Sequence, residues 1–407
     1  MLLLDNLITV LAPVFCWFVA SNLLLFFCFS RVLRRYWLEP VLQHPVVIFE
    51  SDDWGPGPRD QTQALNKLRN ILCRYTDATG RHPVITLGIN LAAPQVTQSE
   101  AARLTYNRKL LSNPEYARLL EAVNRGVSAG VFALQLHGTE HYCPQVLIDV
   151  ASKDAQVREW LIKGDQYSEL LPDHLQSRWL NARALPTVEH DPDSINDAVA
   201  QEVKIFKAVF GAKPRVTVPN TFAWTDSVEK AWAASGISYL ITCGKRFTGR
   251  DSSGYLVSDN KEIVNGEQRN GLTCLVRDAY FEPVKGHRAE DALKIVGGYV
   301  DCARPLLFET HRFNFVSLNS KAEQSFDELD CLVREIVQKY PEVRFISSEE
   351  LGDAFIGQSS VLLNTSVSGR CRAWLHRVNQ NWPFRKFSRF TGAQLVISLL
   401  LLGWSKK

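Results

Sequence analysis

The chain has 407 residues, of which 46% are hydrophobic and 22% charged, a composition that suits one large globular domain or two ordinary ones. The net charge of +3 is small and gives no reason to expect a nucleic-acid partner, which usually needs a concentrated basic face. Nine cysteines occur without any C-x-x-C pair, which argues against a disulfide scaffold and favours free thiols in a reducing compartment.

The N-terminal segment is apolar. No charge occurs from residue 7 to residue 30, a stretch of 24 residues, and about 20 apolar residues are enough to span a bilayer. A cleaved signal peptide would have a basic start, whereas here the basic residues Arg31, Arg34 and Arg35 follow the apolar stretch. We therefore expect a transmembrane anchor with a basic flank over residues 1–36. By the positive-inside rule the domain after it faces the cytoplasm.

Residues 37–360 alternate between short apolar runs and amphipathic helical patterns. The runs cover residues 46–51, 84–90, 131–138, 215–221, 238–244, 272–281, 306–311 and 343–348. The helical patterns cover residues 60–75, 113–127, 194–211, 226–236 and 325–340. This alternation is typical of parallel strands with crossover helices. We expect an α/β fold, a distorted (β/α) barrel of seven or eight strands, with an open doubly wound sheet as the alternative.

The long segment over residues 142–192 exceeds the length of a simple crossover and predicts either a lid or rim over the site or additional packing.

Residues 361–407 predict a second membrane contact. Arg385, Lys386 and Arg389 precede an uncharged stretch over residues 390–405, which is short for a span. Aromatic residues accompany these basic ones, as in membrane-interface segments. We expect a short membrane-associated helix here, with a helix packed on the domain as the alternative.

Three of the apolar runs end in groups that can carry chemistry. Asp52 and Asp53 close the first run, His137 closes the third and is followed by His141, and His311 closes the seventh. In parallel α/β folds reactive groups collect where strands end. Two imidazoles and a carboxylate form a three-ligand site with an open position, which is how a catalytic zinc is usually held. The alternative for the histidine pair alone is two structural histidines with satisfied hydrogen bonds.

The adjacent carboxylates Asp52 and Asp53 would repel each other at the end of a buried strand. A divalent cation removes this difficulty, because one Asp can bind the metal while its neighbour accepts a proton from the metal-bound water. Capping of the next helix is the alternative, but it leaves the convergence with the histidines unexplained.

In this order of motifs the chain resembles the polysaccharide deacetylase superfamily, carbohydrate esterase family 4 in the broad sense. The match covers roughly residues 44–355 and rests on the Asp-Asp strand end, the His-x-x-x-His motif and the late strand that ends in His. The resemblance implies a distorted (β/α) barrel with Asp52 as catalytic base and His311 as general acid. It also implies Asp53, His137 and His141 as ligands of a divalent metal, most suitably Zn²⁺.

The chain departs from the family pattern around the substrate. Trp54 is inserted before Gly55, and Arg215 lies four residues before Pro219 rather than two. Arg277 and Asp278 only approximate the family's fourth motif. The residues expected to contact substrate are Trp54, Arg215, Asn220, Trp224, Arg277 and Asp278.

From this resemblance we expect a membrane-anchored hydrolase that removes an N- or O-acetyl group from a sugar of a glycan, a lipid-linked precursor or a nucleotide sugar. One alternative is a glycoside hydrolase in which Asp52 forms a carboxylate pair with Asp278 or Glu309. The other alternative is an inactive barrel that serves as a membrane-anchored binding or scaffold protein.

Overall fold

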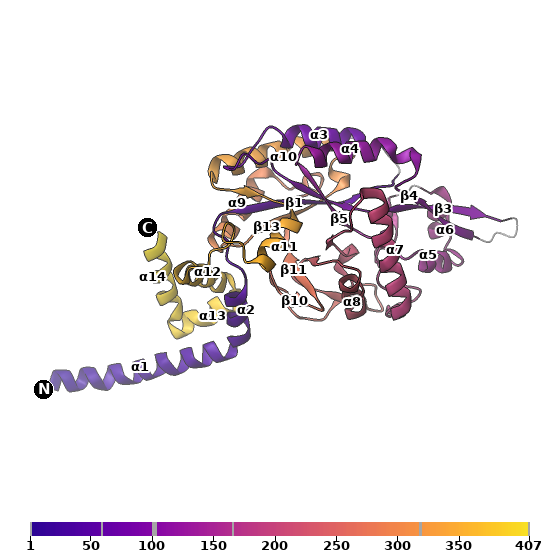
Figure 1. Ribbon diagram of the computed structural model, residues 1–407. Coiled ribbons are helices and arrows are strands. Elements are labelled where there is room, and N and C mark those ends of the chain that lie inside the picture. Colours follow the sequence, from indigo (N-terminus) through magenta and orange to yellow (C-terminus); the bar gives the residue numbers. More distant parts are fainter. Residues whose placement is uncertain (1, 58–59, 100–103, 165–166, 317–319, 406–407) are drawn as a thin grey trace.

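The protein has a mixed α/β fold with a curled β-sheet at its centre (Figure 1). The computed structural model describes residues 2–57, 60–99, 104–164, 167–316 and 320–405. The sheet has ten strands, in the order β10-β11-β7-β6-β5-β2-β1-β13-β12, with β14 beside the start of β1. These strands are β1 (Val46–Trp54), β2 (Ile85–Ile89), β5 (Phe132–Leu136), β6 (Val216–Thr217), β7 (Tyr239–Thr242), β10 (Gln268–Arg269), β11 (Leu272–Val276), β12 (Ala279–Tyr280), β13 (Leu306–His311) and β14 (Arg344–Phe345).

Each of the eight predicted apolar runs contains at least one strand of this sheet, and every pairing except that of β10 with β11 is parallel. All nine residues of β1 are buried, because the strand is covered on both faces. The register places Asp52 beside His311 and Glu50 beside Glu309 on neighbouring strands. Reactive groups from β1 and β13 therefore reach the same edge of the sheet.

The expectation of a distorted barrel is confirmed in part: the described strands form a curled half-barrel whose end strands, β10 and β12, are not paired with each other. The run over residues 272–281 does not form one strand. It divides into β11 and β12, which lie at opposite ends of the strand order. Only Arg277 and Asp278 connect them, so these two residues cross the seam of the curled sheet.

Helices cover the outer faces of the sheet, and the five predicted helical patterns all contain one. The helices of this body are α3 (Thr62–Leu72), α4 (Ala117–Ser128), α7 (Pro192–Phe210), α8 (Asp226–Ala234), α9 (Ala289–Asp301), α10 (Ser320–Lys339) and α11 (Ser348–Gly357). In Figure 1, α10, α3 and α4 lie side by side along one face, while α7 and α8 pack together on another.

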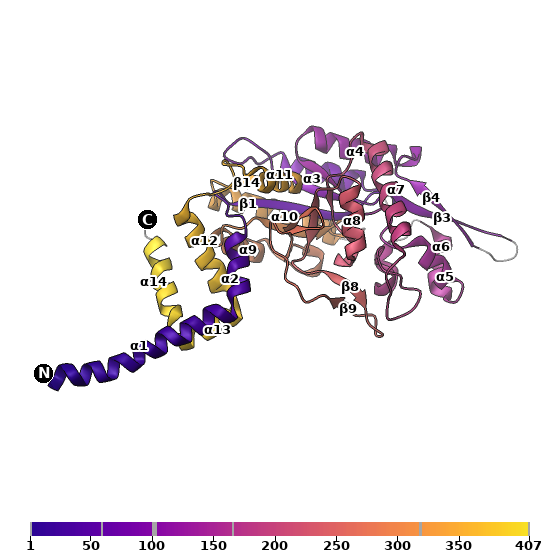
Figure 2. The same cartoon turned by 60° about the horizontal axis from the view of Figure 1, so that its bottom comes forward.

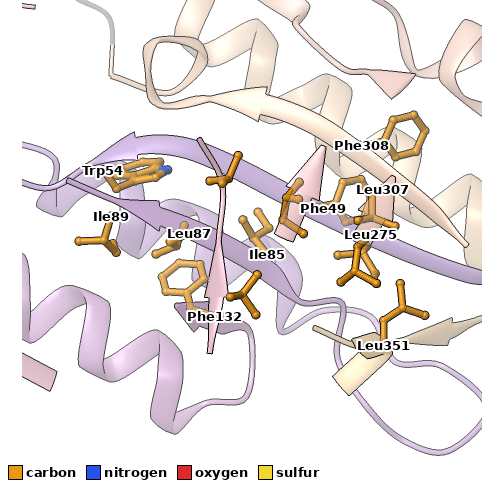
Figure 3. Close-up of a cluster of buried hydrophobic side chains, with 14 of the residues drawn as sticks. Phe49, Trp54, Ile85, Leu87, Ile89, Phe132, Leu275, Leu307, Phe308 and Leu351 are labelled. Atoms are coloured by element: carbon orange, nitrogen blue, oxygen red, sulfur yellow. The ribbon is translucent and has the colours of Figure 1, made fainter. Parts of the chain in front are cut away.

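The main core lies between this sheet and these helices. Figure 3 shows Phe49, Ile85, Leu87 and Phe132 among the side chains that fill it, and all four are at most 4% exposed. Burial of such side chains contributes about 1.5–3 kcal/mol each, so this layer holds the strand ends in place.

The long segment after β5 forms a small unit of its own at one end of the sheet. It contains α5 (Pro144–Ala151) and α6 (Ala155–Lys163), which pack against the hairpin of β3 (Ala92–Gln98) and β4 (Leu104–Leu110) around a second hydrophobic cluster. A second hairpin, β8 (Phe247–Arg250) and β9 (Leu256–Ser258), extends from the body in Figure 2.

The opposite end of the molecule carries the terminal helices, of which α1 and α14 are apolar. The terminal helices are α1 (Leu2–Cys28), α2 (Ser30–Leu38), α12 (Val367–Gln380), α13 (Trp382–Thr391) and α14 (Ala393–Ser405). By length and composition α1 could cross a membrane over residues 11–28, and α14 is a shorter apolar helix.

Candidate active site

The two carboxylates at the end of β1 point to different partners because the strand bulges between them. The pairing of β1 with β2 shifts register between Ser51 and Trp54, and Asp53 has a left-handed φ of 71°. Such strained conformations often occur at functional sites. Gly88 on β2 leaves room for this arrangement, since a Cβ there would lie 2.3 Å from Oδ1 of Asp52.

Arg277 crosses the seam of the sheet and binds three carboxylates at once. Its Nη1 donates to Glu50 at 3.0 Å and its Nη2 donates to Asp52 at 2.7 Å, while its Nε lies 3.2 Å from Oε2 of Glu309. The guanidinium lies over the ring of Phe222, and the whole side chain is 1% exposed. One buried cation therefore organises the carboxylates of both β1 and β13.

The carboxylates around Arg277 differ in protonation. Burial alone would raise the pKa of Asp52, but the charges of Arg277 and His137 hold it below its ordinary value. Burial outweighs Arg277 at Glu50, whose pKa rises to about 7, and it also raises the pKa of Glu309. Two of the three carboxyl groups thus hold a proton more readily than Asp52 does.

Asp53 meets the two histidines that follow β5. Oδ1 of Asp53 lies 3.4 Å from Nε2 of His137 and 3.6 Å from Nε2 of His141, and one ligand atom from each of the three residues lies within 4.8 Å of the others. Burial lowers the pKa of His141 to about 4, while the nearby imidazoles overcome burial at Asp53 and lower its pKa. A neutral imidazole and an ionised carboxylate are the forms that bind metal. These three residues could therefore hold a divalent ion.

The turn after β6 orients His137. Nδ1 of His137 lies 3.0 Å from the carbonyl oxygen of Val218, and Asn220 donates to the backbone oxygen of His137 at 2.9 Å. A ring N–H donated to a carbonyl directs the other ring nitrogen toward the metal. Here that nitrogen, Nε2, faces Asp53, and the side-chain amide nitrogen of Asn220 lies 3.3 Å from it. Thr221 and Phe222 have φ values of 55° and 52°, so this turn is strained where it supports the site.

His311 faces the same region from β13 and is held by Glu282. Nδ1 of His311 lies 2.5 Å from Oε1 of Glu282, and its Nε2 lies 3.7 Å from Oε1 of Glu309. Asn314 also donates to Glu282. Burial opposes a positive charge on His311, but the hydrogen bond and charge of Glu282 prevail and raise the pKa of the imidazole to about 9.

The long segment after β5 reaches the edge of this site. The Arg312 guanidinium lies 5.2 Å from the centre of the Tyr167 ring, and Arg312 directly follows His311. The surrounding chain and the charge of Asp53 raise the pKa of Glu169 in the same segment. Of the two uses expected for residues 142–192, this contact fits a rim, while α5 and α6 mainly form packing.

Several residues predicted to contact substrate lie elsewhere. Trp54 and Trp224 are fully buried, with their indole N–H groups donating to Ser51 and Glu229. Both rings fill the core because burial of a large aromatic surface is favourable. Neither ring lines an open groove.

Arg215 and Asp278 are also separate from the site. Arg215 precedes β6 and forms ion pairs with Glu349 and Asp353 of α11. Asp278 accepts a hydrogen bond from Tyr299 and lines a different cavity. Of the predicted substrate residues, only Asn220 and Arg277 lie at the site, and both are buried supports.

Glu50 and Glu282 also lie at the site, although they were not predicted from the sequence. Glu282 lies two residues after the end of β12, and this position close to a strand end was a usable signal. Glu50 lies two residues before Asp52 on the same strand, and side chains at this spacing share a face of a strand.

A family model for glycosyl hydrolase family 57 matches residues 179–281, about a quarter of the chain. No curated protein matches the chain. Similar solved structures include 4-α-glucanotransferase from Thermococcus litoralis, at 9% identity and a TM-score of 0.41. They also include a family 4 acetyl xylan esterase from Clostridium thermocellum in complex with a cobalt ion, at 10% identity and a TM-score of 0.38.

Each alignment covers 78% of this chain, but they cover 41% of the glucanotransferase and 94% of the esterase. This chain therefore spans less than half the length of the glucanotransferase.

The expected sugar deacetylase activity is corrected by these comparisons. The matching family model is that of a glycoside hydrolase family. The alternative of a glycoside hydrolase agrees with these findings better. The deacetylase resemblance survives only as structural similarity at low identity.

We expect His311 to stay protonated up to about pH 9 in chelator-treated protein, because Glu282 holds its proton. The proton stabilises the folded state fully below the unfolded pKa of about 6.5, and this contribution is lost as pH rises through about 9. Glu282→Gln removes the charge and should lower the pKa of His311. NMR titration of the histidine ring resonances, assigned with His311→Gln, measures both values. A wild-type midpoint near 6.5 would contradict the pairing.

We expect about one divalent ion per chain in protein purified without chelators, and little in His137→Ala or His141→Ala. The matched control is His82→Ala, since Nδ1 of His82 contacts the backbone oxygen of Tyr75 outside this cluster. Elemental analysis of the four proteins measures the loss. Equal metal content in all four would show that these residues hold no ion.

Proposed function

We propose that the protein is a carbohydrate-active hydrolase that cleaves a glycosidic bond. The observation that carries this proposal is the pair of carboxyl groups, Asp52 and Glu309, which lie on neighbouring strands and contact one arginine. Arg277 belongs to the segment that matches glycosyl hydrolase family 57, whereas the two carboxyl groups come from outside it.

The pair suits the two roles that glycoside hydrolysis needs. One carboxyl group gives a proton to the departing sugar oxygen, and an ionised one stabilises the positive charge that develops on the sugar ring or activates the nucleophile. Asp52 is the ionised member, because Arg277 donates to it directly and the charges of Arg277 and His137 lower its pKa. Glu309 is the proton donor, 5% exposed beside His311.

The geometry favours Glu309 over Asp278 as the partner of Asp52. Glu309 contacts the same guanidinium as Asp52 and lies on the neighbouring strand. Asp278 is directed to Tyr299 instead, although it adjoins Arg277 in sequence.

The cluster of Asp53, His137 and His141 fits a bound metal as part of this site, and its nitrogen-rich ligand set suits Zn²⁺ best. When bound, the ion supplies a positive charge that polarises a sugar oxygen or a water molecule. The residues of the chain supply the rest: Asn220 and Val218 orient His137, and Glu282 keeps a proton on His311.

We expect Glu309→Gln to lower kcat/KM about 10²–10⁴-fold on an unactivated glycosidic bond, the usual contribution of a general acid. A dinitrophenyl glycoside needs no proton on its leaving group, so the same variant should cleave it nearly as well as the wild type. Steady-state kinetics on both substrates separates these effects.

Asp278→Asn serves as the matched control and should stay within a few-fold of wild type on both substrates. An equal loss on both substrates in Glu309→Gln would remove Glu309 from the acid role and indicate structural damage.

A further inference from the structure

The C-terminal half of α1 packs against the rest of the folded protein. The side-chain amide of Asn22 donates to the backbone oxygen of Thr391 at 3.0 Å, and the hydroxyl of Thr391 donates back to Oδ1 of Asn22 at 2.9 Å. Leu25, one turn further along, is 5% exposed in a shared hydrophobic cluster. Helix α1 is therefore joined to the C-terminal helices by matched polar and apolar contacts.

Aromatic side chains add to the contacts between α1 and the C-terminal helices. The ring of Phe384 on α13 lies 6.3 Å from that of Phe26 and 5.4 Å from that of Phe29, both edge-on. Gly392 turns the chain against α1, since a Cβ there would lie 3.2 Å from the ring of Phe18. Removal of α1 as a leader would expose Phe384, which is 1% exposed. The contacts thus favour an anchor that stays attached over a cleaved signal sequence.

A buried arginine fixes this helical group to the sheet domain. Arg377 on α12 is fully buried, and its Nη1 lies 3.6 Å from Oε2 of Glu39. Its guanidinium donates to the backbone oxygens of Tyr36, Glu39, Pro40, Cys302 and Ala303, at 2.7–3.2 Å. These acceptors come from the end of α2 and from the loop before β13. The terminal helices are therefore held firmly against the sheet domain, rather than connected to it only by a flexible linker.

The same helices expose a large apolar surface. The side chains that are at least 47% exposed are Trp382, Phe387 and Phe390 on α13 and Leu395, Val396, Leu399, Leu400 and Leu402 on α14. So many exposed large apolar side chains on two short helices are unusual in water and indicate a docking site. Basic side chains lie close to it in the chain, at Arg385, Lys386 and Arg389.

Helix α14 has only 13 residues, too few to cross a bilayer, which takes about 20. In Figures 1 and 2 it runs across α1 rather than along it. If α1 follows the membrane normal, α14 lies parallel to the membrane plane at the level of Phe18, against which Gly392 packs.

We propose that α1, α13 and α14 form one membrane-docking surface, in which α13 and α14 lie in the interface of a bilayer that contains anionic phospholipids. Three features identify the lipid surface as the occupant: continuity with the span of α1, aromatic side chains at the boundary, and basic side chains that match anionic headgroups. Arg377 makes this surface a rigid support, so the site is held at a fixed height above the membrane. This inference does not depend on the glycosidase proposal.

The test places a photo-crosslinking amino acid at Leu399 or Phe390 in the full chain, reconstituted in phosphatidylcholine vesicles with and without phosphatidylglycerol. The control position is Tyr255, which is 74% exposed in the hairpin loop between β8 and β9. We expect lipid adducts at Leu399 and Phe390 at least ten-fold above those at Tyr255. All three positions are exposed, so the substitutions should not disturb folding.

A second variant tests the charge. Arg385→Gln, Lys386→Gln and Arg389→Gln together should reduce labelling at Leu399 several-fold in vesicles with phosphatidylglycerol and leave it unchanged in phosphatidylcholine alone. The intact mass of the membrane-purified chain should include α1. Labelling equal to that at Tyr255, adducts to a second protein chain instead of lipid, or loss of α1 from the purified protein would each overturn the proposal.

Discussion

The guanidinium of Arg277 is the constraint on which the site depends. The strand β11 lies near one end of the curled sheet and β12 at the other, and Arg277 lies in the two-residue connection between them. From there it binds Glu50, Asp52 and Glu309, which come from the two central strands β1 and β13. A buried cation without its partners is strongly unfavourable, and loss of one partner costs about 3–5 kcal/mol. The ion cluster therefore holds the seam together and sets the charge of the reactive edge.

The adjacent carboxylates Asp52 and Asp53 avoid mutual repulsion by serving two different clusters. Asp52 faces Arg277, whereas the bulge turns Asp53 toward His137 and His141. This separation gives a carboxylate-arginine cluster beside a cluster able to bind metal, with His311 near both. Electrostatic environments that differ over a short distance are typical of sites where one group must give a proton and another must carry charge.

Hydrophobic period, a local signal, predicted strands in all eight apolar runs and five helices of the body, but not α9, α11 or the two hairpins. Strand ends predicted that Asp52, Asp53, His137, His141 and His311 gather at one edge of the sheet, where the structure has them. The sequence did not predict the seam. The run over residues 272–281 reads as one strand, and only the three-dimensional path shows that Arg277 divides it. Arg215 was misplaced for a related reason: it precedes β6, so it lies at the opposite edge of the sheet from the site. Trp54 and Trp224 were expected to contact substrate, but both rings are buried in the core, where burial of a large aromatic surface is favourable.

The most direct test of the account is the fate of water oxygen during turnover. An acetylated oligosaccharide would be incubated with the wild-type protein in ¹⁸O-water and the products analysed by mass spectrometry. We expect shortened oligosaccharides that carry the label at the new reducing end. Label in released acetate, with the oligosaccharide length unchanged, would contradict glycosidic cleavage as the activity of this site.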